Sequence, residues 1–561
     1  MPHIRHSIFC ILCISVLAFI TKLVADPPGF TLPFDPYSIK PNGIKSIDDL
    51  SPEEKTRRIE ILRSDVFTQS YDSVLSVTQR KLTGDVRLRH KTTTFTGDSA
   101  LLYVESNYVE AGGSIHIKNG DTLNIYSDFI KYYGDMRIST LIGNVIIDDG
   151  KMQINAPTLD YDMEKDVGTY FQGATIIKDS TTITSVQGRY DYRHQLAYFK
   201  EKVHLTTRDY DIYADSMRYD INKDIAYFIG TTKIYGDEDT IVTTSGFYDN
   251  KSGKLSFDGR TTIRRSNATL TGDTILIDKN TNKGKAMGDV SFVQKEENFE
   301  IQSGIIVYAD SSGYSKAYTD PLLIQIDTAE SDTLYLSADT ILSYYTYYVK
   351  DSIIGRRDSA RIIRAYYHTK IFSKDLSAVS DSLYADYRDS VMILTGHPLA
   401  WMDSTQISAD TLHILMKNGK VNEIILHNNA WISTMNNDSL FDQIKGNDIH
   451  IYLINNKIRH IYVDGNAESI YYLKNDSKAY MGGNRTKSAY INVNVFDDEI
   501  QQISLLQSPE AVFTPMKDIN TDTFILDGFI WHWGLKPTDK WSVIRNSSRY
   551  RKITNIAEDT P

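Results

Sequence analysis

The chain has 561 residues and a formal net charge of −11 at pH 7, with 41% apolar and 24% charged residues. This apolar content is sufficient for a folded core, and the negative charge argues against a nucleic-acid partner, because nucleic-acid-binding domains are usually basic. Tyr is unusually frequent, with 37 residues, and together with many Thr, Ile and Val it favours β-strands.

Residues 1–25 have the pattern of a signal peptide. Arg5 provides a positive start, Ile8–Ile20 is an apolar run, and Ala25 is a small residue at a plausible cleavage position. The run is shorter than the roughly 20 residues of a membrane-spanning helix. Cys10 and Cys13 both lie in it, so the exported chain would have neither disulfide nor thiol chemistry. An uncleaved N-terminal anchor is the alternative.

Residues 26–69 form a proline-rich lead-in to the rest of the chain. Within it, Ser51 followed by Pro52 and Glu54 is typical of a helix start, with Ser as the cap and Pro at the first position. This pattern predicts a short helix that ends near Ser64.

A regular repeat fills the chain between Gly84 and Phe292. In each copy a Gly, or Glu201, is followed at +2 and +4 by apolar or β-branched residues, and successive copies start 28 to 30 residues apart. A fixed period near 29 indicates one supersecondary unit stacked on copies of itself. The anchors are Gly84, Gly113, Gly143, Gly173, Glu201, Gly230, Gly259 and Gly288.

Within each copy, polar residues separate the apolar ones, which is the period of a strand with one wet face and one buried face. The second half of each copy alternates between a small residue plus Asp, as in Ala214-Asp215, and Gly-x-Tyr, as in Gly188-Arg189-Tyr190. Neighbouring copies therefore differ, which predicts two facing antiparallel sheets. The Asp is expected to cap its own turn. Hairpin tips are predicted at 118–120, 148–150, 251–253 and 417–420.

The repeat is regular over 70–320 and divergent over 321–516. Residues 341–370 depart most and predict an insertion or a short helix. Arg356, Arg357, Arg361 and Arg364 lie there, either to contact anionic groups such as phosphates or as a solvated face. Residues 517–561 are a C-terminal extension with a basic end, expected to be a poorly ordered tail.

No metal-ligand spacing, nucleophile motif, phosphate loop or dinucleotide motif occurs in the sequence. The chain is therefore expected to be no enzyme and to need no cofactor. The repeated apolar positions would form a stripe that is either a dry core or an open groove for acyl chains. The groove-facing candidates are Val86, Leu88, Ile115, Ile117, Val145, Ile147, Phe171, Ile177, Val203, Leu205, Phe228, Ile234, Phe257, Ile263, Val290 and Phe292.

The repeated units resemble those of the OstA/LptA family. Gly143-Asn144-Val145 with Leu159-Asp160-Tyr161-Asp162, and Val203-His204-Leu205 with Ala214-Asp215 and Ala226-Tyr227-Phe228, follow that pattern. The match is repeated from about 70 to 310 and weaker to about 515. The resemblance implies an elongated, open β-jellyroll in the periplasm that carries lipopolysaccharide from the inner to the outer membrane, with acyl chains in the groove.

The same resemblance implies partners. Family members dock end to end with related jellyroll proteins by strand addition, and an open stack of strands also permits self-association. Only about 45 residues follow 515, too few for the barrel of the family's outer-membrane member, which favours the soluble bridge component. Two other classes stay open: a structural or adhesive β-solenoid at the cell surface, and a secreted β-helix enzyme that degrades polysaccharide.

Overall fold

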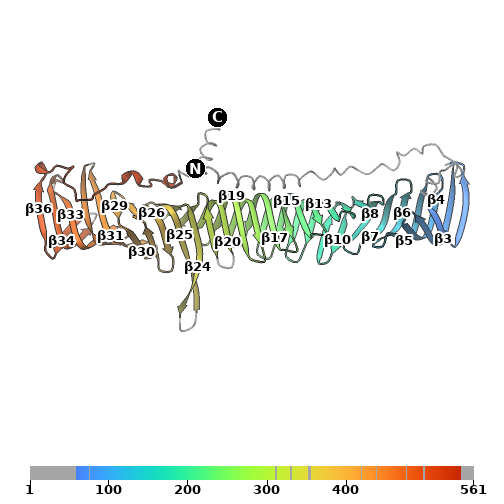
Figure 1. Cartoon of the computed structure of the whole chain (residues 1–561), viewed down its shortest axis with the longest axis horizontal. Coiled ribbons are helices and arrows are strands. Elements are labelled where there is room, and N and C mark those ends of the chain that lie inside the picture. The colour runs from blue at the N-terminus through green and yellow to red at the C-terminus, as the bar shows by residue number, and fades with distance from the viewer. Residues whose placement is uncertain are drawn as a thin grey trace, which may run out of the picture. The chain divides into compact units, whose positions relative to one another are not determined.

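In the computed structural model, the described part of the chain consists mainly of β-strands, which confirms the all-β prediction (Figure 1). The structure describes residues 58–74, 76–309, 313–328, 331–351, 356–417, 420–437, 439–455, 457–475, 477–496 and 499–544. The chain divides into two compact units, Met1–Thr232 and Lys233–Pro561, called unit 1 and unit 2 below. The predicted signal peptide lies outside the described residues. So do residues 51–57, where the predicted helix would start, but Glu60–Arg63 form a strand, so the predicted helical end is wrong.

The strands of unit 1 follow one another in chain order. They are β1 (Glu60–Arg63), β2 (Val66–Asp72), β3 (Val77–His90), β4 (Thr93–Tyr103), β5 (Tyr108–Asn119), β6 (Leu123–Tyr133), β7 (Ile138–Asp148), β8 (Gln153–Asp162), β9 (Val167–Tyr170), β10 (Ala174–Lys178), β11 (Thr181–Ser185), β12 (Gln187–Asp191), β13 (Leu196–Thr206) and β14 (Asp211–Asp220). β15 (Ile225–Tyr235) crosses the division between the units.

Unit 2 continues the pattern with more short strands and ends in brief helical turns. Its elements are β16 (Thr240–Asp249), β17 (Lys254–Arg264), β18 (Ala268–Asp278), β19 (Lys283–Gln294), β20 (Phe299–Ala309), β21 (Tyr314–Tyr318), β22 (Leu322–Asp327), β23 (Asp332–Ser337), β24 (Thr340–Asp351), β25 (Arg356–Phe372), β26 (Ser377–Asp386), β27 (Val391–Thr395), β28 (Leu399–Met402), β29 (Thr405–Ser408), β30 (Thr411–Lys417), β31 (Lys420–Asn437), β32 (Leu440–Ile454), β33 (Lys457–Lys474), β34 (Tyr480–Phe496), β35 (Glu499–Leu506), β36 (Glu510–Pro515), η3 (Met516–Asp518), η4 (Trp533–Leu535) and α3 (Lys540–Ile544).

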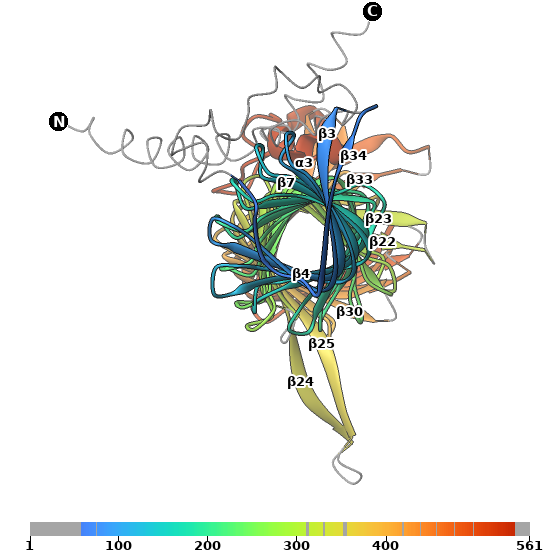
Figure 2. The same cartoon turned by 90° about the vertical axis from the view of Figure 1, so that its right-hand side faces the viewer.

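The long strands bend in the middle, where their antiparallel pairing is interrupted. The register between β5 and β6 shifts after Gly112, and that between β7 and β8 shifts after Ile142. The residues at these points are left-handed, for example Gly113 with φ 80° and Ser114 with φ 45°, which is the geometry of a β-bulge. Because neighbouring strands bend at the same place, the sheet of each unit folds over and its two halves face each other. In the end-on view the strands of unit 1 curve round one interior (Figure 2).

The recurring Asp supports the bend of the following strand. A Cβ added to Gly143 would lie 2.4 Å from Asp128 Oδ2, and one added to Gly113 would lie 2.3 Å from Asp98 Oδ2. Asn144 Nδ2 donates a hydrogen bond of 2.8 Å to Asp128 Oδ2. The Asp therefore has the structural role that was predicted, but it packs against a neighbouring strand instead of capping its own turn.

Hairpins form a row at each end of the folded strands. In unit 1 the first row includes the turns after β3, β5 and β7, and the second includes those after β4, β6 and β8. In unit 2 the first row includes the turns after β17, β19, β22, β25 and β28, and the second includes those after β16, β18, β24, β26 and β30. The predicted tips at 118–120, 148–150 and 251–253 are such turns, and Lys417 pairs with Lys420 across the fourth. Because each strand is bent, the two rows within a unit face each other. The line where they meet is called the seam.

Residues 341–370 are not helical. They belong to β24 and β25, which pair along Thr340–Asp351 and Arg356–Tyr366 as a hairpin that projects from unit 2 (Figure 1). Tyr347 and Val349 on this arm are exposed. The insertion alternative is therefore retained, and the short helix is wrong.

The described part of the C-terminal extension, to Ile544, is packed on unit 2. Leu526 is fully buried against Leu440, Ile470 and Tyr472. Its backbone N–H donates to Gln443 Oε1 at 2.9 Å, and that of His532 donates to Gln406 Oε1 at 2.7 Å. The expectation of a poorly ordered tail is wrong for these residues, because apolar side chains and buried amides fix them on the sheet.

Candidate functional site

Most of the predicted groove residues point into the folded sheet. The side chains that are buried are Val86, Leu88, Ile115, Ile117, Val145, Ile147, Val203, Leu205, Phe228, Ile234, Phe257, Ile263 and Val290. Phe292 is half-buried and pairs with the buried residues Leu270 and Ile301. Burial establishes that these positions face inward. Whether they contact lipid stays a prediction.

Two of the predicted groove residues are misplaced. Ile177 is 41% exposed and points outward, while its neighbour Ile176 is buried and pairs with Ile154 and Ile183. Phe171 is half-buried and lies outside a strand, and Tyr170 takes the inward position. Side chains alternate along a strand, so when the anchor is displaced by one residue, the positions predicted to face inward face outward instead. Gly173 lies one position later in its bend than the other anchor residues do in theirs. The spacing of only 28 residues from Gly173 to the next anchor, Glu201, was the sign of this displacement in the sequence.

The interior of unit 1 between β3 and β6 is closely filled by its own side chains. The cavity bordered by Val86, Leu88, Ile115 and Tyr132 has a volume of about 10 Å³, which is the space of about one water molecule. At these rungs the predicted apolar stripe is closely packed. An acyl chain could enter here only if the seam opened.

Hydrogen bonds between the two rows of hairpins close the seam of unit 1. His90 Nδ1 lies 2.5 Å from the Tyr132 hydroxyl, and Lys178 Nζ donates to Asp224 Oδ1 at 3.1 Å. The Tyr190 hydroxyl donates to Asp149. Burial raises the pKa of Tyr132 to about 12, so this hydroxyl keeps its proton at neutral pH. The bridges recur because Tyr132, Tyr190 and their equivalents follow the 29-residue period.

The outer surface of unit 1 has a hollow of about 850 Å³ at the bend. Pro157 stands there where other copies carry Asp, and its lack of an N–H interrupts the ladder. Asn144, Asn155, Gln172 and Lys202 are among the residues that line it. The hollow is wide open to solvent, so it would leave most of an acyl chain exposed to water.

Unit 2 contains an apolar cavity of about 500 Å³, a volume within the usual range of small-molecule sites. Its walls come from inward-facing residues of several strands, and its mouth lies between first-row turns, such as 373–376, and second-row residues, such as Tyr387 and Ser390. It is therefore an opening of the seam. The apolar residues of the wall include Leu323, Leu334, Leu336, Ile363, Leu383, Ala385, Met392, Met402, Ile414, Met416, Val421 and Ile424.

None of these wall residues was among the predicted candidates, because the cavity lies in the divergent part of the repeat. Single long strands are replaced there by pairs of short ones, such as β21 with β22 and β27 with β28, and Pro321 and Pro398 precede the second member of each pair. Proline cannot donate to a ladder. Met392, Met402 and Met416 add flexible side chains that adapt to irregular ligands. These prolines and methionines were the features of the sequence that could have indicated the cavity.

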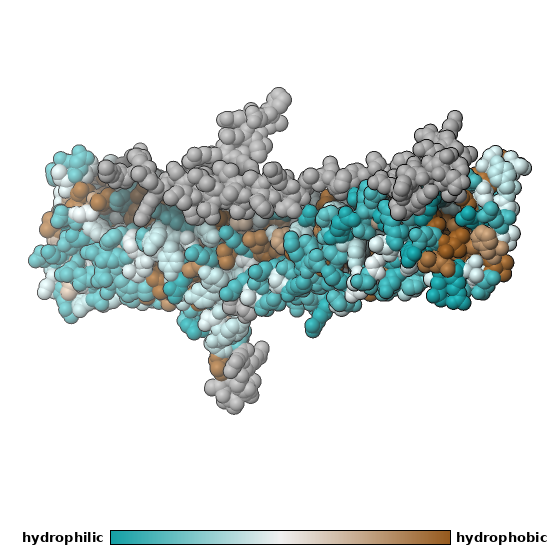
Figure 3. All heavy atoms as spheres, turned by 45° about the vertical axis from the view of Figure 1, so that its right-hand side comes forward, coloured by the Kyte–Doolittle hydropathy of each residue, from teal (hydrophilic) through white to brown (hydrophobic). Residues whose placement is uncertain are grey.

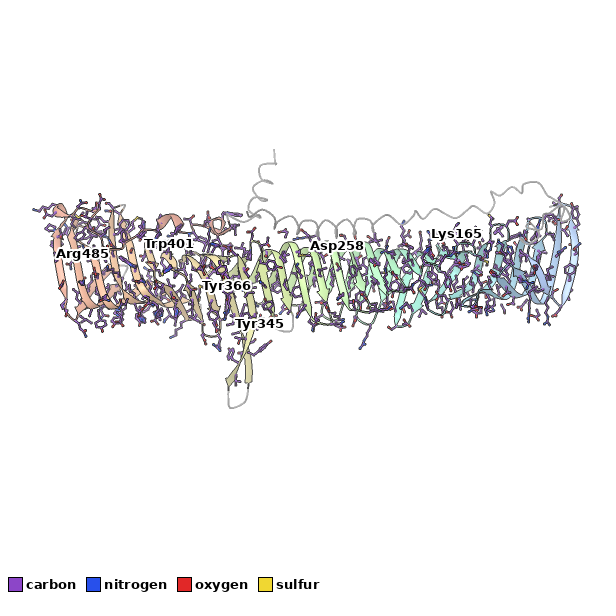
Figure 4. All side chains as sticks on the ribbon, in the orientation of Figure 1. Lys165, Asp258, Tyr345, Tyr366, Trp401 and Arg485 are labelled. Atoms are coloured by element: carbon purple, nitrogen blue, oxygen red, sulfur yellow. The ribbon has the colours of Figure 1, made fainter. Side chains whose placement is uncertain are left out.

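A buried arginine pairs with Glu297, one of the residues that line this cavity. Arg361 is 5% exposed, and its Nε donates to Glu297 Oε2 at 2.7 Å. Its other nitrogens donate to Ser343 Oγ at 2.7 Å and to Gln294 Oε1 at 2.6 Å, and the guanidinium lies 4.5 Å from the centre of the Phe299 ring. Figure 4 labels Tyr345 at the base of the projecting arm, and its hydroxyl accepts a hydrogen bond from Arg361.

The other described arginine of the cluster behaves differently. Arg364 is exposed on the outer face, where it donates to the hydroxyl of Tyr344 at 3.2 Å and lies over the ring of Tyr384. The side chains of Arg356 and Arg357 lie outside the described residues. Of the two sequence interpretations, the solvated face fits Arg364, whereas Arg361 is an inward-facing cation.

Among the described strands, β2 near one end and β36 at the other each have a partner on one side alone. β2 pairs with β3 and exposes Val66, Phe67 and Tyr71, and apolar atoms gather at this end of unit 1 (Figure 3). β36 pairs with β34 and exposes Val512 and Phe513. Edges of this kind can accept a further strand from another chain.

Among the described residues, no three His, Cys, Asp or Glu side chains are grouped so that they could bind a metal ion. In the same part of the chain, no helix has both the length and the apolar composition that crossing a bilayer requires.

Residues 56–215 match the family described as OstA-like protein. No curated protein matches the chain in sequence. Among solved structures, the chain is similar to LptH from Pseudomonas aeruginosa, the LptA-homologous periplasmic component of its lipopolysaccharide transport device, with 12% identity and a TM-score of 0.20 over 25% of this chain and 95% of that one. Over residues 56–215, the chain is therefore similar to the OstA-like family.

Proposed function

We propose that this protein is a periplasmic lipopolysaccharide carrier that serves outer-membrane assembly. The observation that supports this best is the apolar cavity of unit 2, open at the seam of a folded β-sheet, in a chain with an OstA-like domain. Lipid acyl chains would occupy the cavity, and the sugar head group would extend through its mouth into solvent. Removing apolar surface from water stabilises such a complex by about 25 cal/mol per Å².

The lipid would be held by many weak apolar contacts, so it could leave the cavity without the breaking of a strong bond. In unit 1 the same lipid could be taken up only while the bridges between the hairpin rows are open. The cross-seam contacts of His90, Asp149 and Lys178 are individual hydrogen bonds or ion pairs, with Asp149 accepting from both Tyr190 and Gln195, and each has a net stability of about 1 to 3 kcal/mol. The free energy needed to open the seam at one pair of hairpins is therefore small compared with that of unfolding the whole unit.

The exposed edges of β2 and β36 would carry the end-to-end contacts. A strand of a related jellyroll protein of the inner- or outer-membrane machinery, or of a second copy, would pair there. The exposed side chains Phe67 and Phe513 would then become buried, which adds apolar contact to the backbone hydrogen bonds.

A photo-crosslinking amino acid at Met392 tests the carrier function. Met392 lines the cavity, whereas Ile393, the next residue of β27, pairs with Tyr384 on the opposite face of the sheet. We expect lipopolysaccharide to be captured in cells at position 392 and several-fold less at 393. Equal capture at the two positions would contradict lipid binding in the cavity. Probes at Val145 and Leu205 would report whether lipid also enters unit 1.

A further inference from the structure

The contacts of Arg361 point to a specific role for this residue at the cavity. A guanidinium that is 5% exposed has lost most of its hydration, and a buried charge is tolerated only with a well-placed partner. The partner here is Glu297, and neutral groups from Ser343, Gln294 and Tyr345 complete the set of acceptors. Arg361 therefore always needs one anion beside it.

The anion that Arg361 now holds is placed where it can be exchanged. Glu297 belongs to the turn of residues 295–298 between β19 and β20, and its side chain is 36% exposed. The remainder of the set lies in strands: Gln294 ends β19, and Ser343, Tyr345 and Arg361 belong to β24 and β25. A movement of the turn alone would leave the cation and its neutral neighbours in place.

Glu297 also lines the apolar cavity, as does Ile363 two residues after Arg361 on the same strand. An anionic group attached to acyl chains in the cavity could therefore reach the position of the Glu297 carboxylate. A phosphate suits the planar fork of arginine because, like the carboxylate that it would replace, it can accept two parallel N–H bonds. The hydroxyls of Ser343 and Tyr345 can donate to its remaining oxygens.

We propose that Arg361 binds a phosphate of the lipid head group and that Glu297 is the internal substitute for that phosphate in the unloaded protein. The proposal rests on the carrier function proposed above. In this scheme the acyl chains supply the affinity, and Arg361 supplies the selectivity for phosphorylated lipid. Displacement of Glu297 would also release the turn 295–298 from β25, which couples loading to opening of the seam beside the cavity.

The test compares two lipids that share their acyl chains: bisphosphorylated lipid A, and the same lipid with both phosphates removed. Binding to the full chain is measured for wild type, Glu297→Gln and Arg361→Gln. The ratio of the two affinities within each variant does not depend on the folded fraction. Arg361→Lys, which keeps the charge but loses the fork, guards against a folding defect in Arg361→Gln.

We expect wild type to prefer the phosphorylated lipid. Glu297→Gln removes the competing charge, so it should raise that preference by about tenfold. Arg361→Gln should abolish the preference, and Arg361→Lys should retain part of it. Arg388→Gln is the matched control, because Arg388 also pairs with a carboxylate of the cavity mouth, Asp386, but is exposed. It should keep the wild-type ratio.

Equal affinity for the two lipids in wild type and in Glu297→Gln would overturn the role of Arg361 and leave the acyl-chain site intact. Failure of every variant to bind either lipid would overturn the carrier function, and this inference with it. Inorganic phosphate alone is the third probe. If it binds as tightly as the phosphorylated lipid and depends on Arg361, the site takes free phosphate and the head-group assignment is wrong.

Discussion

At the scale of single residues, the bend of each strand depends on a left-handed glycine and an aspartate of the preceding strand. Gly143 has φ 79°, and its α-hydrogen faces the carboxylate of Asp128, which also accepts a hydrogen bond from Asn144. Glycine is needed for two reasons, because a side chain would meet both backbone strain and the carboxylate. The bend in turn makes the two halves of the sheet face each other.

A comparison of Gly143→Ala with Gly120→Ala separates the effect of backbone strain from that of the clash with the carboxylate. Both glycines are left-handed, but a Cβ at Gly120 has no atom within 4 Å, whereas one at Gly143 would lie 2.4 Å from Asp128. Gly120→Ala should cost about 1 kcal/mol of unfolding free energy, from strain alone. Gly143→Ala should cost at least about 1 kcal/mol more. Denaturant unfolding of the two variants measures the difference, and equal losses would refute the role of the Asp128 contact.

At the scale of elements, the sequence predicts what is local and periodic. The strands and hairpin tips of residues 84–292 follow from alternation, glycine and turn chemistry. The one misregistered copy, at Gly173, arose because the glycine was taken as the fixed point of the repeat, whereas the bend is fixed by the pairing with Ile154 and Ile183. Periodicity shows that alternate residues share a face of the strand, but the pairing with neighbouring strands decides which face is buried.

Elements that depend on distant contacts could not be predicted in this way. The segment from Met516 to Ile544 is ordered by partners far away in sequence, such as Gln406 and Gln443. The cavity of unit 2 exists because the side chains between its strands do not fill the space there. The volume that remains empty cannot be derived from a single sequence. The buried state of Arg361 depends on Glu297, which is 64 residues away.

The packed C-terminal segment leads to a prediction at this scale. Leu526 of this segment is fully buried, whereas Ile530, four residues later, is 61% exposed. Leu526→Asp should detach the segment, since the loss of a buried leucine costs about 2 to 5 kcal/mol and the carboxylate adds a desolvation penalty. Protease cleavage between 516 and 544 should accelerate strongly in this variant. Ile530→Asp should be cleaved at the wild-type rate. Slow cleavage of Leu526→Asp would show that the polar contacts alone hold the segment.

At the scale of the whole molecule, one repeated plan gives two different interiors. In unit 1 the regular repeat fills its core, and its hairpin rows are bridged by Tyr, His, Asp and Lys side chains. In unit 2 the divergent repeat leaves an apolar cavity that opens between the rows. The part of the chain that keeps the family pattern least closely is therefore the part with room for a ligand.

The most direct test of the account is the amount of lipid that co-purifies with the chain when a charge is placed inside the cavity. Met392→Asp puts a carboxylate among the apolar wall residues, and Ile393→Asp puts the same group on the opposite face of β27. Quantitative mass spectrometry of bound lipid should find about a tenfold loss or more in Met392→Asp, because acyl chains would bury that charge, and wild-type lipid in Ile393→Asp. Wild-type lipid content in Met392→Asp would contradict the claim that acyl chains occupy this cavity.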